Sequence, residues 1–349
     1  MGYIVLAKGL TKEQLQDIQK LEKTCSDFEK LDMKLNLEML EQRSKEEIND
    51  FLYYEESKLV GFLGIYDIDK KSNEIEITGM VHPKYRRRGI FTELFEAAKI
   101  ECSNRNPKNL LLISEKSSVA GAGFIKTTDA IYTFSEYRMR FEGAEVPDCK
   151  KAGIRLRKAE KKDQREVAEM DAEFFGKPDD EAEPEEKAES EVEAESEVGA
   201  ESEVGAESEV GAESEVGAES EVEADMKAVD EPETENNLEK DNLENPDRIT
   251  YIAELDGKTV GKIGTIIGGT GGYIFGVGIL PEFRGRGYGR ELIGLALDKL
   301  ISERIYNVIL EVAVKNENAL YLYKTCGFKE VTVYDYYEIE CGKEKCSHE

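Results

Sequence analysis

The chain has 349 residues, of which 40% are hydrophobic and 35% charged, and its net charge is -28. This length allows two ordinary domains, each with its own core. The acidity is local: residues 176–247 hold 29 acidic and 4 basic side chains, which leaves 46 acidic and 43 basic ones elsewhere. Such a charge disfavours nucleic-acid binding, and no run approaches 18 apolar residues, so neither nucleic acid nor membrane is an expected partner.

The six cysteines are thinly spread without a Cys-x-x-Cys pair, and the first ten residues lack a basic segment followed by a long apolar run. These features predict a cytoplasmic protein with reduced thiols. Cys341, Cys346 and His348 have a poor spacing for metal ligation, and we expect no metal site.

Strands and helices alternate in the first half. Leu15, Ile18 and Leu21 recur at helical spacing and predict a helix over Thr11–Phe28. The other predicted elements are strands at Tyr3–Ala7, Phe51–Tyr54, Leu59–Tyr66 and Glu74–Val81, a helix at Gly89–Cys102, and strands at Asn109–Ser114 and Ala130–Phe141.

The second half repeats this order. Its predicted elements are a strand at Ile154–Arg157, a helix at Lys161–Phe175, strands at Thr250–Leu255, Val260–Ile267 and Tyr273–Leu280, a helix at Gly287–Ser302, a strand at Asn307–Val314, a short helix at Asn318–Thr325 and a strand at Glu330–Ile339. We therefore predict an α/β protein (α+β, mixed sheet) with two tandem copies of one domain, residues 1–145 and 150–349. The acidic segment 176–247 interrupts the second copy.

Residues 189–224 within this segment are six tandem hexapeptides of the form Glu-Ser-Glu-Val-Gly/Glu-Ala. In another phase they match the repeat of left-handed β-helices. Thirty-six residues would form only two coils, in which the stacked glutamate side chains would repel one another. We therefore favour a disordered acidic tether, which could recruit a basic partner.

A Gly- and Arg-rich turn follows the strand at Tyr273–Leu280. It contains Arg284, Gly285, Arg286, Gly287, Tyr288, Gly289 and Arg290, just before the helix. Backbone N–H groups at a helix amino end attract anions, and glycines let a phosphate approach the backbone. The turn predicts an anion-binding cradle.

This turn resembles the pyrophosphate loop of the GNAT acetyltransferase superfamily, Arg/Gln-x-x-Gly-x-Gly/Ala, at Arg284, Gly287 and Gly289. Downstream, Asn316, Ala319 and Tyr323, followed by Gly327-Phe328, look like the second signature of that family. The resemblance implies that the loop binds the pyrophosphate of acetyl-CoA, that the strand at Val277–Ile279 pairs with its pantetheine, and that Asn316 contacts it.

The same resemblance implies catalytic roles for two residues. Tyr323 is expected to be the general acid that reprotonates the CoA thiolate. Glu311 lies where ribosomal-protein alanine N-acetyltransferases place a glutamate, and it is the candidate base for the incoming ammonium. Packing alone for Tyr323 and a solvated charge for Glu311 remain alternatives.

The first half carries a worn form of both signatures. Arg86 and Gly89 match the loop, but Phe91 replaces its second small residue, and Val119 stands where Tyr323 stands in the second half. We interpret this half as structural or substrate-positioning, as in tandem proteins such as mycothiol synthases. His82, just before a proline, fits an exposed loop as well as a functional role.

The sequence thus predicts an acetyl-CoA-dependent N-acetyltransferase that needs no metal and acts by direct attack in a ternary complex. Its acceptor is a small-molecule amine or a protein N-terminus; Tyr334, Tyr336 and Tyr337 resemble the latter class. The alternative is a non-catalytic CoA-binding or scaffold protein whose acidic tether recruits a basic partner.

Overall fold

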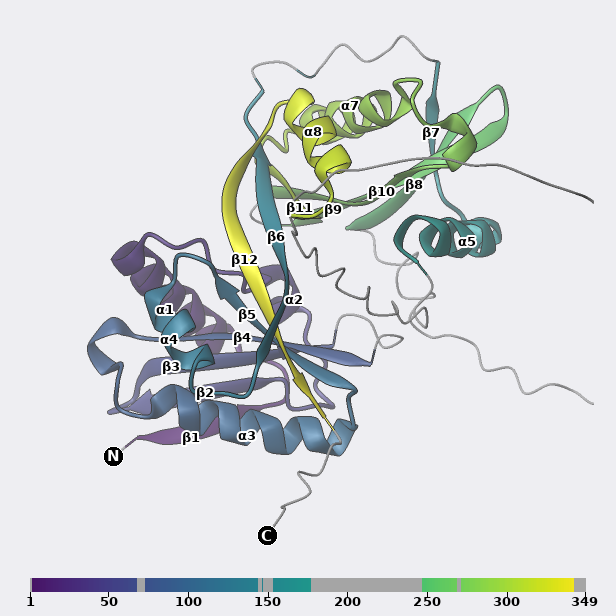
Figure 1. Cartoon of the computed structure of the whole chain (residues 1–349). Helices are drawn as coiled ribbons and strands as arrows, with labels where there is room; N and C mark the ends of the chain where they lie inside the picture. The colour runs from purple at the N-terminus through teal and green to yellow at the C-terminus, as the bar shows by residue number, and fades with distance from the viewer. Residues whose placement is uncertain are drawn as a thin grey trace, which may run out of the picture. The chain divides into compact units, whose positions relative to one another are not determined.

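The computed structural model of the chain describes residues 2–67, 73–143, 146, 153–176, 247–268 and 271–341. The hexapeptides 189–224 and nearly all of the acidic segment lie outside these residues, as do Cys346 and His348. The predicted mixed α/β architecture with two copies is confirmed in the described part (Figure 1).

The N-terminal half follows the predicted order of elements. A Thr11–Gln14 capping box begins α1, and Lys30 in the left-handed conformation ends it. The elements are β1 (Tyr3–Ala7), α1 (Lys12–Glu29), α2 (Leu37–Glu41), β2 (Asp50–Glu55), β3 (Lys58–Tyr66), β4 (Glu74–Val81), η1 (Pro83–Tyr85), α3 (Ile90–Arg105), β5 (Asn109–Glu115), α4 (Val119–Ile125) and β6 (Ile131–Phe141).

The C-terminal half repeats this order without a described counterpart of α2. Its elements are β7 (Arg155–Lys158), η2 (Lys161–Asp163), α5 (Gln164–Phe175), β8 (Arg248–Leu255), β9 (Lys258–Gly268), β10 (Gly271–Ile279), η3 (Pro281–Phe283), α7 (Tyr288–Ser302), β11 (Val308–Ala313), α8 (Glu317–Thr325) and β12 (Phe328–Glu340).

All strands join one sheet in the order β1-β2-β3-β4-β5-β12-β6-β11-β10-β9-β8-β7. The last strands of the two halves are therefore exchanged: β12 pairs with β5, and β6 pairs with β11. Both strands also pair with each other along most of their length (Figure 1).

The cores reflect this exchange. Met139 and Phe141 of β6 are buried among the apolar residues of α7, α8 and β11 in the C-terminal half. Tyr337 and Ile339 of β12 pack in return against the core beneath α3 in the N-terminal half. Each half thus depends on the other for one wall of its core.

Candidate active site

The site of the C-terminal half is built where β10 and β11 separate. These parallel strands pair only from Gly272–Val308 to Ile274–Leu310, while β10 continues to Ile279 against β9 alone. A register shift between Phe275 and Gly278 marks a bulge, and Gly276 within it has a φ of +56°. A bulge re-aims the backbone, and an open strand edge can pair with an extended ligand.

The glycine-rich turn lies at the amino end of α7, as predicted. Gly285 and Gly287 have φ values of +76° and +86°, and a Cβ atom on either would meet no atom within 4 Å. The approach to the first N–H groups of α7 is therefore unobstructed. The Arg284 side chain donates from Nε to the carbonyl oxygen of Ile279, 2.9 Å away, which ties the turn to the end of β10.

The other predicted residues of the turn lie close by. Arg286 and Arg290 are exposed, and Tyr288 packs at the edge of the core. Gly289 is needed for close packing, because a Cβ atom there would lie 3.1 Å from a methyl group of Leu322 on α8. The predicted residues of the turn thus lie together at the amino end of α7.

Asn316 caps the amino end of α8, and Tyr323 lies on this helix. The exposed Asn316 is its N-cap residue, and its Oδ1 accepts a hydrogen bond from the Ala319 N–H at 3.1 Å. Tyr323 is buried against Phe328, and burial raises the pKa of its phenol to about 12. A phenol with this pKa is protonated at neutral pH, as a general acid must be.

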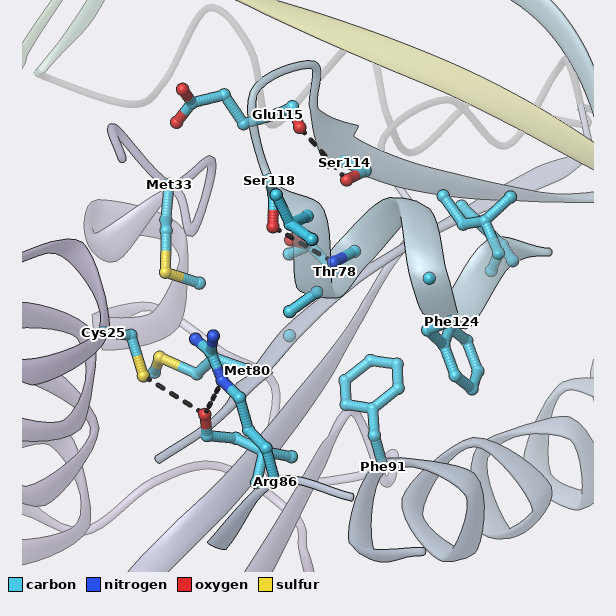
Figure 2. Close-up of a pocket in the computed structure, with 18 of the residues that line it drawn as sticks. Cys25, Met33, Thr78, Met80, Arg86, Phe91, Ser114, Glu115, Ser118 and Phe124 are labelled. Atoms are coloured by element: carbon cyan, nitrogen blue, oxygen red, sulfur yellow. Dashed lines mark hydrogen bonds between the residues drawn. The ribbon is translucent and has the colours of Figure 1, made fainter. Parts of the chain in front are cut away.

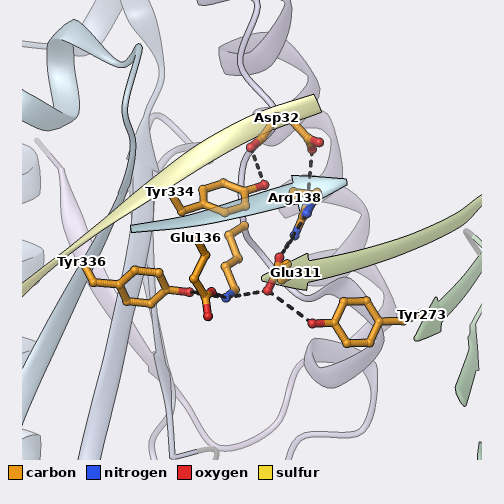
Figure 3. Close-up of polar contacts among 8 residues, drawn as sticks. Asp32, Glu136, Arg138, Tyr273, Glu311, Tyr334 and Tyr336 are labelled. Atoms are coloured by element: carbon orange, nitrogen blue, oxygen red, sulfur yellow. Dashed lines mark hydrogen bonds and ion pairs between the residues drawn. The ribbon is translucent and has the colours of Figure 1, made fainter. Parts of the chain in front are cut away.

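Glu311 points to the opposite face of the sheet from Tyr323. Its neighbours on β11, Leu310 and Val312, are buried in the same core as Tyr323, and side chains alternate along a strand. The Glu311 carboxylate is 2.8 Å from Lys34 Nζ and 2.9 Å from Arg138 Nη2 (Figure 3). Burial alone would raise the pKa of Glu311, but these two cations hold it below its ordinary value.

A wider polar cluster surrounds this carboxylate (Figure 3). Arg138 also contacts Asp32 at 3.2 Å, and the Tyr334 hydroxyl donates to the Asp32 carbonyl oxygen at 2.8 Å. Tyr336 donates to Glu136 at 2.5 Å. Sequence reasoning missed Lys34, Arg138, Asp32 and Glu136, because no local motif marks them and they join Glu311 only through the fold.

A second cation, Lys262 on β9, lies on the same face of the sheet as Glu311. It is buried and forms an ion pair with Asp171 of α5. Its Nζ is 3.4 Å from the position that a Cβ atom would take at Gly276, so it lies beside the bulge. Burial lowers the pKa of Lys262. No local motif points to this residue.

The matching region of the N-terminal half differs in four respects. Strands β3 and β4 pair without a bulge, and Arg86 is engaged by Glu29 at 2.6 Å. Phe91 turns its ring onto Phe124, with ring centroids 4.6 Å apart, and also crowds Gly79 on β4. Val119, at the position of the missing phenol, is 81% exposed.

A cavity of about 730 Å³ opens between the separating ends of β4 and β5 in this half (Figure 2). Phe91 and Phe124 line one side, and Cys25, Met33 and Met80 line another. Lys34 also contributes to its lining. The N-terminal half therefore has a cavity beside the segment that corresponds to the second family signature, although it lacks the tyrosine of that signature.

His82 does not occupy an exposed loop. It is 8% exposed, its Nδ1 accepts a hydrogen bond from the Lys84 N–H, and its ring packs edge-on against Tyr85. Burial and the charges of Lys58 and Lys84 lower its pKa. These contacts make His82 a local cap of η1.

Comparison with known proteins establishes the family. The sequence profile of the acetyltransferase (GNAT) family matches residues 13–124 and 218–328, once in each half. The chain therefore belongs to the GNAT acetyltransferase family, in a tandem form.

Three similar proteins illustrate the likeness. An N-alpha-acetyltransferase of Sulfurisphaera tokodaii is 31% identical over 104 residues, which are 25% of this chain and 60% of that protein. A [ribosomal protein bS18]-alanine N-acetyltransferase of Salmonella typhimurium is 35% identical over 72 residues, 20% of this chain and 49% of that protein. The matched regions thus span less than two thirds of these curated relatives.

A tandem GNAT protein from the clavulanic acid biosynthesis pathway has a similar structure, with a TM-score of 0.63 at 14% identity. The match covers 98% of this chain and 99% of that one. At this identity the likeness concerns the fold.

In the described ranges, no helix is long and apolar enough to cross a membrane. Among the same residues, no group of three or more His, Cys, Asp or Glu side chains could hold a metal ion.

Proposed function

We propose that the C-terminal half transfers the acetyl group of acetyl-CoA to a primary amine by direct attack in a ternary complex. One observation carries this proposal: Tyr323 and Glu311 lie on opposite faces of the sheet at the strands that separate beyond Ile274. An acid on one side of a thioester and a base on the other are what aminolysis requires.

In this proposal the amino end of α7, with Arg284 beside it, holds the pyrophosphate. The open edge of β10 at Val277 and Ile279 pairs with the pantetheine, and Asn316 contacts the cofactor. The residues fit such an anion because Gly285 and Gly287 leave the helix end open. Backbone N–H groups near the bulge would polarise the thioester carbonyl.

The acceptor ammonium gives a proton to Glu311, directly or through water, and the neutral amine attacks the carbonyl carbon. The C–N bond forms, the attacking nitrogen loses its second proton to solvent, the C–S bond breaks, and Tyr323 gives its proton to the thiolate. The phenolate then recovers a proton from solvent, and Glu311 releases to solvent the proton that it took from the ammonium. No metal takes part in this scheme.

The acceptor is a protein N-terminus or a small amine. The names of the Sulfurisphaera and Salmonella relatives favour the N-terminus, whereas a spermidine N(1)-acetyltransferase of Vibrio cholerae, 42% identical over 57 residues, favours the small amine. A cytoplasmic location is part of the proposal, and the free thiols of Cys25, Cys102 and Cys341 suit a reducing compartment.

The test is calorimetric titration of the whole chain with acetyl-CoA, followed by CoA-release assays with an alanine-initiated peptide and with spermidine. We expect one acetyl-CoA site per chain and turnover of one acceptor class. Two sites would show that Phe91 does not close the first loop. Absence of binding would contradict the enzyme and favour the scaffold alternative.

A further inference from the structure

The carboxylate at the C-terminal site is held by the other half of the chain. Glu311 belongs to β11, whereas Lys34 lies between α1 and α2, and Arg138 lies on the exchanged strand β6. Arg138 is directly opposite Glu311 in the β6–β11 pairing. The strand exchange therefore places Arg138 beside Glu311 (Figure 3).

Both carboxylate oxygens of Glu311 are engaged by neighbouring donors. Glu311 Oε1 accepts from Arg138 Nε at 3.1 Å and Nη2 at 2.9 Å, and Oε2 faces Lys34 Nζ at 2.8 Å and the Tyr273 hydroxyl at 3.4 Å. A carboxylate offers about four acceptor positions. The Tyr273 contact is the longest, so it is the one that an acceptor ammonium or a water can replace most easily.

Lys34 is equally engaged. Its three N–H groups meet Glu311, Glu136 at 3.4 Å and the Tyr336 hydroxyl, and its side chain is 8% exposed. Opposite charges this close favour the ionised carboxylate. A buried ion pair by itself need not stabilise a fold. The ion pairs of Glu311, the candidate base, therefore require an explanation other than stability.

We propose that Lys34 and Arg138 are positioning residues for the C-terminal active site, and that they hold Glu311 ionised and turned toward the acceptor. This inference rests on the proposed function. The N-terminal half would then have a function in catalysis, because Lys34 and Arg138 both belong to it and not to the C-terminal half, which carries the two complete signatures.

The charged and titratable groups that face Glu311 come from several elements. They are Lys34 before α2, Glu76 on β4, Glu136 and Arg138 on β6, Tyr273 on β10, and Tyr334 and Tyr336 on β12. Asp32, also before α2, joins the cluster through its ion pair with Arg138. Lys34 and Arg138 are the cations in this set. Removing either one should therefore raise the pKa of Glu311.

The experiment compares the pH dependence of kcat/KM in Lys34→Gln, Glu311→Gln and the double variant, with whichever of the alanine-initiated peptide and spermidine the wild type acetylates. In Lys34→Gln, the pH at which kcat/KM falls on the acidic side of the profile should rise by about 1 to 3 units, which is the effect of one close charge on a carboxylate pKa. The double variant should be no slower than Glu311→Gln. Acetyl-CoA affinity should be unchanged in all three, which separates positioning from loss of fold.

Lys99→Gln is the matched control, because it removes a lysine of the same half from the exposed pair with Glu96. Arg138→Gln tests the inference independently should Lys34→Gln fail to fold, with the same upward shift expected. The inference would be overturned if the acidic side of the kcat/KM profile did not shift, or if the losses in kcat/KM of the two single variants multiplied in the double variant. Either result would leave the proposed acetyl transfer standing. Wild-type protein inactive on both acceptors would overturn both proposals.

Discussion

The two halves have nearly the same order of elements and differ at the positions that we propose for acetyl-CoA binding. Strand β10 bulges at Gly276, whereas β4 runs regularly to Val81. Gly289 lets α7 pack closely against Leu322 of α8, whereas Phe91 at the equivalent position packs its ring against Phe124. A repeated core tolerates such local differences, because packing depends on the apolar pattern, whereas the candidate site depends on a few exceptions to that pattern.

The largest effect is expected at Tyr323, the phenol that the N-terminal half lacks. Tyr323→Phe should lower kcat by about 100-fold or more, the usual contribution of a general acid, and leave acetyl-CoA affinity intact. Tyr321→Phe is the control, because Tyr321 lies on the same helix and is 71% exposed. Unaltered turnover in Tyr323→Phe would remove it as the acid.

The strand exchange can be tested at Met139 of β6, which is fully buried in the C-terminal core. Met139→Ala should lower the free energy of unfolding by about 2 to 5 kcal/mol in urea titrations. The control is Ile131→Ala on the same strand, where the side chain is 74% exposed. Because each core includes a strand of the other half, we also expect one unfolding transition; two separate transitions would argue against mutual dependence.

Gly287 and Gly89 form a matched pair across the halves, with φ values of +86° and +80° and open space at both. Alanine at either position should cost about 1 to 2 kcal/mol of backbone strain. Only Gly287→Ala should also weaken acetyl-CoA binding, by about tenfold, as measured by calorimetry. Equal loss of binding in Gly89→Ala would mean that the first loop binds as well.

The smallest effect is expected from the acidic segment, which has no counterpart in the first half. Replacing residues 178–246 with a short Gly/Ser linker should leave acetyl transfer unchanged, since surface insertions are tolerated where they leave the core intact. Progress curves for the shortened and full chains test this directly. A clear loss of activity would give the segment a part in catalysis or acceptor binding.

Local pattern was enough to predict most elements of this protein. The helix predicted at Thr11–Phe28 is observed at Lys12–Glu29, and the strand predicted at Ala130–Phe141 at Ile131–Phe141. The turn at Arg284–Gly289 was also recognisable, because its glycines and arginines are adjacent in the chain. Periodicity and short motifs are encoded within a few residues, so the sequence alone determined them.

Only the tertiary structure decided which strand completes which half. Strands β6 and β12 both alternate apolar and polar residues, and this pattern fits either position in the sheet. Arg138 meets Glu311 across 173 residues of chain, through a pairing that no local signal specifies. Contacts between distant residues follow from the packing of the whole sheet, which is why the surroundings of Glu311 could not be predicted from the sequence.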